Sequence, residues 1–184
     1  GLSLGARPLD VKAGAAHLRE RGFRRFAGYG FSMGAAVVLM GAAECPGLVG
    51  LVLDSGPVVH LYAACKGVID ARMTGDPPER RRAAARRLYL DGMGWRYRRD
   101  LEAAAARIPR IPALILHGER DEVLPPAETA LLQRQVLQGP CERVVLPATE
   151  HVTGWARHRR RYRELVLDFL RGVGERSGRP GVVG

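Results

Sequence analysis

The chain has 184 residues, of which 46% are hydrophobic and 26% are charged, and this composition is typical of one globular domain with a sizeable core. It contains no run of residues long and apolar enough to span a membrane. The net charge is +10 and rests almost wholly on arginine, because Lys12 and Lys66 are the only lysines. The three cysteines, Cys45, Cys65 and Cys141, lack metal-ligand spacing, which favours a reducing, cytoplasmic compartment.

Helix and strand patterns alternate over the first third of the chain. Leu48 to Leu53 has no polar side chain, as expected of a parallel strand buried on both faces. Two strands joined by a helix indicate a parallel βαβ unit. The expected elements are a loop at 1–8, a helix at 10–21, a strand at 26–29, a turn at 30–34, a helix at 35–40 and a strand at 48–53.

The alternation is interrupted at residues 55–110 and then resumes. The interruption contains helical patterns at 59–72, 78–89 and 95–106. Beyond it, the expected elements are a strand at 112–117, a helix at 126–137, a strand at 143–146, a helix at 159–173 and a flexible tail at 174–184. Together these patterns predict a three-layer α/β sandwich with a mostly parallel sheet.

The turn at 30–34 reads Gly-Phe-Ser-Met-Gly, a G-x-S-x-G pattern between a strand and a helix. Such a turn lifts the hydroxyl of Ser32 above the end of the strand, where it can act as a nucleophile. We expect Gly30 and Gly34 to be required, because side chains there would collide across the bend. The amide of Met33, at the start of the helix, is expected to face a negative oxygen that develops at Ser32. The alternative is a simple turn with a solvated hydroxyl.

A serine nucleophile needs a general base within hydrogen-bond reach, and that base needs an anion behind it. In an open parallel sheet such groups lie in loops at the carboxyl ends of strands. Two later loops fit this description: His117 to Pro125, which contains Asp121, and Pro147 to His151. Serine, then acid, then histidine, each soon after a strand, is the chain order of an α/β-hydrolase.

In these motifs the chain resembles the α/β-hydrolase superfamily, within its single-domain esterase, monoglyceride-lipase and serine-aminopeptidase-like branches. The resemblance covers roughly residues 1–173. The motifs that carry it are Gly30-Phe-Ser32-Met-Gly34, Leu51-Val-Leu-Asp-Ser55, His117-Gly-x-x-Asp121-x-x-x-Pro125, and Glu150-His151 followed by Trp155. The resemblance implies that Ser32 is the nucleophile, Asp121 the orienting acid and His151 the general base.

Several of these residues have a second interpretation. Asp121 could simply cap its own turn, and Asp54 is a rival acid, because some members of the superfamily place the acid after the preceding strand. His151 could be a loop histidine without a role. Glu119 and Glu122 are expected to be solvated.

The other histidines have no catalytic counterpart in a matching motif. We expect these four, His17, His60, His117 and His158, to be structural or surface residues. No grouping of His, Cys and Asp has metal-ligand spacing. Neither a metal nor a cofactor is therefore expected.

The chain departs from the resembling superfamily at its amino end. About four strands normally precede the helix that begins here near Asp10, and they carry the loop with the second oxyanion amide. We therefore expect either a fragment of a longer hydrolase or a half that is supplied elsewhere. The edge of the strand at 26–29 would then be uncovered and could promote self-association. The interval 56–110 corresponds to the place where the superfamily inserts a cap over the active site.

Arginine clusters occur at 80–87, 96–99 and 157–161. They could bind phosphates, but no nucleic-acid motif accompanies them, and solvated helix faces are the favoured interpretation. The sequence thus predicts a serine hydrolase that acts on a small-molecule carboxylic ester, without a cofactor, a metal or a nucleic-acid partner. The alternative is a truncated, non-catalytic hydrolase-like domain that serves as a binding or interaction module.

Overall fold

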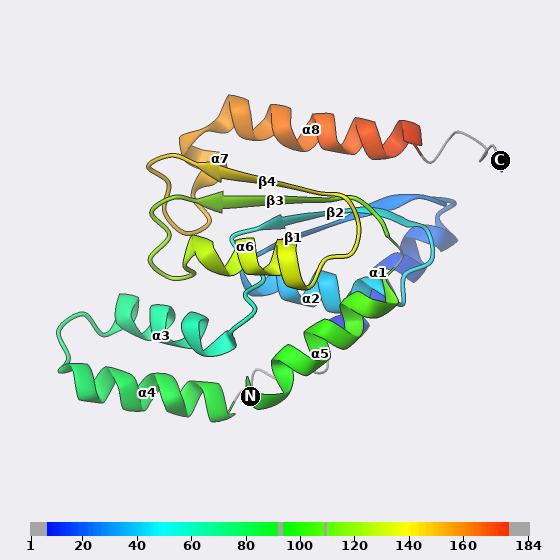
Figure 1. Cartoon of the computed structure of the whole chain (residues 1–184). Helices are drawn as coiled ribbons and strands as arrows, with labels where there is room; N and C mark the ends of the chain where they lie inside the picture. The colour runs from blue at the N-terminus through cyan, green and yellow to red at the C-terminus, as the bar shows by residue number, and fades with distance from the viewer. Residues whose placement is uncertain (1–6, 92–93, 109, 177–184) are drawn as a thin grey trace.

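The computed structural model describes residues 7–91, 94–108 and 110–176. Its centre is a four-stranded sheet in which the strands lie in chain order and every neighbouring pair is parallel (Figure 1). The strands are β1 (Phe26–Phe31), β2 (Leu48–Asp54), β3 (Ala113–Gly118) and β4 (Cys141–Leu146). The expected parallel sheet is therefore confirmed.

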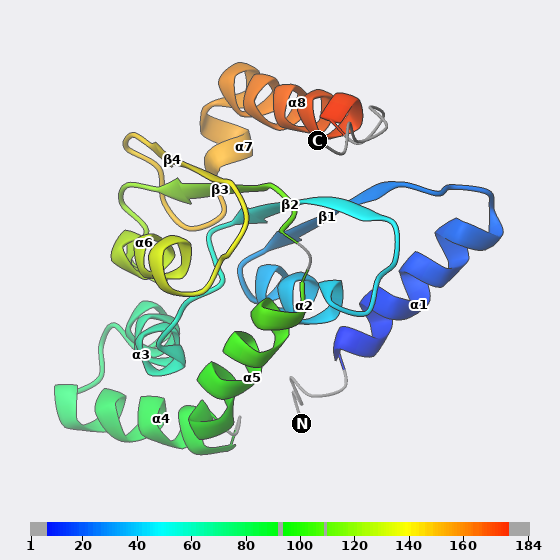
Figure 2. The ribbon, with the colours of Figure 1, turned by 45° about the vertical axis from the view of Figure 1, so that its right-hand side comes forward.

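Helices cover both faces of this sheet. The helices of the described residues are α1 (Arg7–Glu20), α2 (Met33–Ala42), α3 (Leu61–Arg72), α4 (Pro78–Asp91), α5 (Gly94–Arg107), α6 (Pro126–Gln135), α7 (Gly154–Arg157) and α8 (Arg159–Arg176). Helices α7 and α8 lie on one face, whereas α2, α5 and α6 lie on the other (Figure 2). This arrangement is the three-layer α/β sandwich that the sequence predicts.

Alternate residues of the central strands enter opposite layers of the core. Leu51 and Leu53 pack with the α2 layer, whereas Val52 between them packs with α8. In β3, Ile115 packs with the α2 layer and Leu114 packs with α8. Burying each of these side chains contributes about 1.5–3 kcal/mol, which accounts for the continuous apolar runs of both strands.

The observed boundaries differ from the predicted ones mainly at element ends. Strand β1 extends past Tyr29 to Phe31, because two further residues pair with β2 before the chain turns. Helix α7 was not expected, since four residues are too few to show a helical period. Helix α1 begins at Arg7 and α8 continues to Arg176, so both overlap the expected terminal loop and tail. The rest of those predictions, at 1–6 and 177–184, lies outside the described residues.

Residues between β2 and β3 form the expected helical segment of α3, α4 and α5. Helix α5 packs against α2, and the Tyr97 hydroxyl donates a hydrogen bond to the Val58 carbonyl at 2.9 Å. Helix α3 approaches the loop after β3 so closely that a Cβ on Gly67 would lie 2.0 Å from the Val123 carbonyl oxygen. The segment therefore contacts the rest of the domain through α5, which packs against α2, and through α3, which meets the loop after β3.

The arginine-rich stretches lie mostly on exposed helix faces. On α4, Arg87 pairs with Asp91 one turn away at 3.2 Å. Arg81 is less exposed, and its pair with Asp70, also at 3.2 Å, links α4 to α3. Exposed ion pairs of this kind contribute roughly 0–1 kcal/mol each, so they matter more for solvation than for stability.

Candidate active site

The carboxyl ends of β1, β3 and β4 bring Ser32, Asp121 and His151 together. His151 Nε2 lies 2.9 Å from Ser32 Oγ, and His151 Nδ1 lies 2.8 Å from Asp121 Oδ2. An ionised carboxylate can only accept, so Nδ1 carries the ring proton and Nε2 can accept one from the serine hydroxyl. Three residues that are as far as 119 positions apart in the chain thus form one hydrogen-bonded series.

Ser32 lies in a strained turn between β1 and α2. Its φ is 49°, in the left-handed region that residues other than glycine rarely adopt. Its amide donates to the Asp54 carbonyl at 2.8 Å, which keeps the turn aligned with β2. A Cβ on Gly30 would lie 2.5 Å from the Gly34 carbonyl oxygen, so the predicted need for glycine at position 30 is confirmed. The same prediction for Gly34 is wrong, because a Cβ there would face open space.

Asp121 is held on both of its carboxylate oxygens. Oδ1 accepts the backbone N–H groups of Val123 at 3.0 Å and of Leu124 at 2.7 Å. The side chain is 0% exposed, and its other oxygen, Oδ2, is left to face His151. Capping the turn and orienting the histidine are therefore not alternatives, because one carboxylate does both.

The loop after β4 is fastened to the loop after β3. The amide of Arg120 donates to the Thr149 carbonyl at 2.9 Å, and the amide of Ala148 donates to Glu119 Oε2 at 2.8 Å. A Cβ on Gly118 would lie 2.3 Å from the Thr149 carbonyl oxygen, so only glycine permits this approach. Glu119 is exposed to solvent, as expected, and its carboxylate also holds the neighbouring loop.

A further hydrogen bond holds the histidine loop against the end of β2. The Val152 amide donates to Ser55 Oγ at 3.2 Å, and that hydroxyl donates to Asp54 Oδ1 at 2.8 Å. Val152 and Ser55 both have left-handed backbones, with φ of 58° and 52°. Such conformations cost on the order of 1 kcal/mol or more and persist only where surrounding contacts impose them. The loop is thus held rigidly beside Ser32.

Asp54, the rival acid, is occupied by other partners. It is 2% exposed, and its carboxylate accepts the hydroxyls of Ser55 and Tyr162. Burial raises the pKa of Asp54, and these two hydroxyl bonds partly offset the increase. Burial likewise raises the pKa of Tyr162, which also bonds the Tyr29 hydroxyl. Among the described residues Asp54 makes no hydrogen bond to His151, so the geometry favours Asp121.

Met33 follows Ser32 and is the first residue of α2. The amide of the first helical residue has no acceptor within the helix. It makes no hydrogen bond to any other described residue. The amide is therefore free to receive an anion beside Ser32.

The remaining histidines occupy surface or structural positions. His17 is exposed on α1. The His158 ring donates from Nε2 to the Pro147 carbonyl at 2.9 Å, which supports the loop after β4. His117 is fully buried at the end of β3.

Glu128 is a structural residue that no sequence pattern identifies. It lies in the first turn of α6, where an acidic residue normally offsets the helix dipole. Here it also accepts the backbone amides of Val59 and His60, each at 2.9 Å, and the His60 ring at 3.0 Å. It therefore fixes the start of α3 to α6. Only the three-dimensional structure could reveal this, since the partners are nearly 70 positions away.

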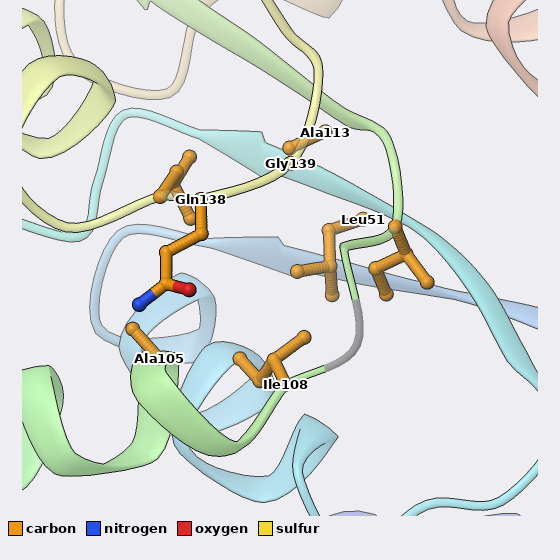
Figure 3. Close-up of a pocket in the computed structure, with 8 residues that line it drawn as sticks. Leu51, Ala105, Ile108, Ala113, Gln138 and Gly139 are labelled. Carbon is orange, nitrogen blue, oxygen red and sulfur yellow. The ribbon is translucent and has the colours of Figure 1, made fainter.

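Two hollows lie in the described part of the chain, and Ser32 lines neither of them. Figure 3 shows an apolar one of about 10 Å³ between α5 and the sheet, with room for about one water molecule. Its lining residues are Leu51, Ala105, Ile108, Ile111, Ala113, Leu137, Gln138 and Gly139. The second, of about 220 Å³, lies between α3 and α4 and is lined by Lys66, Asp70, Pro78, Arg81 and Arg82.

The cysteines are free thiols with little tendency to ionise. Burial raises the pKa of Cys45 and Cys65, and it raises the pKa of Cys141 to about 11. Within the described ranges, no group of three or more His, Cys, Asp or Glu side chains is placed to hold a metal ion. Every helix in those ranges is too short or too polar to cross a bilayer.

Comparison with solved structures identifies three informative neighbours. An esterase from Pyrococcus furiosus has a TM-score of 0.67 and 22% identity, over 93% of this chain and 64% of its own. An alpha/beta fold family hydrolase from Bacillus anthracis has a TM-score of 0.62 and 15% identity, over 92% of this chain and 76% of its own. A proline iminopeptidase from Mycobacterium smegmatis has a TM-score of 0.60 and 20% identity, over 91% and 72%.

No protein-family model and no curated protein matches the sequence. The chain spans 60% to 64% of the length of the Pyrococcus furiosus esterase in its solved structures. At these identities the likeness establishes the fold. The chain therefore has the α/β-hydrolase fold, of which it contains part.

Proposed function

We propose that the chain is a serine hydrolase that acts on carboxylic esters. The observation that carries this proposal is the hydrogen-bonded series from Asp121 through both ring nitrogens of His151 to Ser32, at 2.8 and 2.9 Å. Such a series activates a hydroxyl that is otherwise a poor nucleophile near neutral pH. Asp121 is fully buried, whereas the His151 side chain is 19% exposed, so a substrate can reach the ring.

In the proposed reaction Ser32 Oγ attacks the acyl carbon of the ester while His151 Nε2 takes the hydroxyl proton. The Nδ1–H bond to Asp121 holds the required tautomer and stabilises the imidazolium that forms. His151 then gives the proton to the alcohol oxygen as the ester bond breaks. A water molecule, activated by the same nitrogen, attacks the acyl-enzyme and releases the carboxylic acid together with Ser32.

The amide of Met33 is proposed to stabilise the oxyanion of each tetrahedral intermediate. It lies at the amino end of α2, where the helix dipole also favours negative charge. One donor alone is a partial oxyanion hole, and removing a donor typically costs about 10²–10³-fold in turnover. We therefore expect slow turnover unless a second donor is supplied from outside the described residues.

A small-molecule ester is the proposed substrate class. The names of the neighbours, an esterase and an iminopeptidase, support acyl transfer to water and leave ester and amide substrates to be distinguished. The decisive experiment is a panel of p-nitrophenyl esters of graded chain length, with amide analogues. Hydrolysis of esters with little cleavage of the amides is the expected result.

Replacing His151 with alanine is expected to lower ester turnover by on the order of 10³-fold or more, because the serine loses its general base. His17→Ala is the matched control: it removes an exposed histidine from α1 and should leave turnover unchanged. Equal rates for the two variants would refute the role of His151.

The choice between the two acids has its own test. Asp121→Asn is expected to lower turnover by on the order of 10³–10⁴-fold, because an amide favours the wrong tautomer of His151. Asp54→Asn should lower it less than about tenfold, because the amide oxygen can accept one of the hydroxyls of Ser55 and Tyr162 and the amide N–H can donate to the oxygen of the other. A larger loss in Asp54→Asn than in Asp121→Asn would transfer the role to Asp54.

We propose that residues 56–110 form a cap beside this site. The close approach of Gly67 to Val123 supports this, because Val123 belongs to the loop that carries Asp121. Glu128 adds a second attachment at the start of α3. The cap would then determine which acyl chains reach Ser32. The ester panel also measures this preference for acyl chain length.

The second candidate is a non-catalytic interaction module. The observation that favours it is the outer edge of β1, which pairs with no other described strand. The exposed rings of Tyr29 and Phe31, both on β1, stack with centroids 4.7 Å apart. Concentration-dependent self-association in sedimentation, without ester turnover, would favour this candidate over the enzyme.

A further inference from the structure

His117 is a buried titratable group that the proposed reaction does not use. It is the fifth residue of β3 and is 0% exposed. Its Nε2 lies 2.8 Å from the Leu124 carbonyl oxygen. A carbonyl oxygen only accepts hydrogen bonds, so Nε2 must carry the proton. His117 is therefore a hydrogen-bond donor toward the loop that contains Asp121.

The other ring nitrogen determines the charge of His117. Nδ1 is buried and has no hydrogen-bond partner among the described residues. A proton there would be a buried donor without an acceptor, which is unfavourable. Burial lowers the pKa of His117 and Arg143 adds to this effect, whereas the hydrogen bond to Leu124 and the charges of Asp121 and Asp54 oppose it. The unpartnered Nδ1 and the burial both favour the neutral ring.

The same Nε2–H lies beside the candidate acid. It is 3.3 Å from Asp121 Oδ2, the oxygen that accepts the bond from His151. Leu124, whose carbonyl accepts from His117, donates its own amide to Asp121 Oδ1. His117 thus contacts the acid directly and also through the backbone of residue 124.

We propose that His117 is a positioning residue: as a neutral Nε2–H donor, it clamps the loop after β3 and holds Asp121 Oδ2 toward His151 without cancelling the carboxylate charge. A cation at this place would compete with the imidazolium that forms at His151, because both would neutralise the same oxygen. A neutral donor gives orientation and leaves the full charge for His151. This inference rests on the proposed function.

Two substitutions separate the hydrogen bond from the volume of the ring. His117→Gln places an amide N–H near the position of Nε2, whereas His117→Leu fills the site without a donor. We expect His117→Leu to lower the rate of Ser32 labelling by a fluorophosphonate by about tenfold or more. His117→Gln should restore that rate to within about threefold of the wild type, although both variants lose stability to a similar extent.

The control is Gln133→Leu, which removes a side-chain bond to another backbone carbonyl, that of Cys141 at the amino end of β4. Gln133 makes no hydrogen bond to Ser32, Asp121 or His151, so this variant should lower stability and leave the labelling rate of the folded protein unchanged. Equal labelling rates in His117→Leu and the wild type, or equal loss in the Gln and Leu variants, would overturn the proposal.

A second readout does not depend on catalysis. The proton on His151 Nδ1 is expected to give a downfield NMR signal protected by its bond to Asp121 in the wild type and in His117→Gln. The signal should be lost through exchange in His117→Leu. Its persistence there would refute the positioning role even if the wild type is never labelled, whereas absence of wild-type labelling alone would count against the proposed function.

Discussion

Replacing Ser32 with alanine is expected to lower ester turnover by on the order of 10⁴-fold or more, because Ser32 Oγ is the only hydroxyl among the described residues that is hydrogen-bonded to His151, the proposed base. Alanine keeps the Cβ atom and removes only the hydroxyl oxygen, Oγ. Its unfolding midpoint should therefore match that of the wild type. Turnover is measured on the best ester of the panel, and the thermal unfolding midpoint shows that the variant is folded.

Ser32→Gly is the informative companion of the alanine variant. Glycine adopts the φ of 49° without the penalty that a Cβ imposes, so this variant should be about 1 kcal/mol more stable than the wild type. It should be as inactive as Ser32→Ala. If both variants hydrolyse the ester at the wild-type rate, the nucleophile is a residue other than Ser32.

Replacing Gly30 with valine is expected to destabilise the domain by about 3 kcal/mol. The new Cβ would lie 2.5 Å from the Gly34 carbonyl oxygen and 2.7 Å from the Ala35 Cα, both backbone atoms that cannot rotate away. Strand β1 and helix α2 would have to separate, and Ser32 between them would move. Urea unfolding measures the loss, which corresponds to roughly 2–4 °C in Tm for each kcal/mol in a chain of this size.

Gly14→Ala is the matched control for this prediction. Gly14 lies in α1, where an added Cβ would meet nothing within 4 Å. Alanine should stabilise the helix there by about 0.5–1 kcal/mol. An unchanged stability in Gly30→Val would mean that β1 and α2 are not packed as closely as described.

Much of the fold could be predicted because its signals are local. The apolar runs of β2 and β3 follow from burial on both faces, and the parallel direction of the strands follows from the helices between them. The grouping of Ser32, Asp121 and His151 could be predicted for the same reason. Each follows a strand, and parallel strands end at one edge of the sheet.

The contacts that hold the site rigid could not be predicted. Glu119 is charged and exposed in a loop, and nothing nearby in sequence indicates that it accepts the Ala148 amide 29 positions later. Gly67 reads as an ordinary helix residue, yet its missing side chain allows α3 to meet the loop of Asp121. Such contacts depend on how distant elements pack, which a local pattern does not encode.

The central claim is that Ser32 is a nucleophile activated by His151, and covalent labelling tests it most directly. The protein is incubated with a fluorophosphonate, digested, and the modified peptide is identified by mass spectrometry. The expected result is one adduct per chain, on Ser32, formed in the wild type and in His17→Ala but not in Ser32→Ala, and formed far more slowly in His151→Ala. An adduct on another residue, or labelling of Ser32→Ala at the wild-type rate, would contradict the claim.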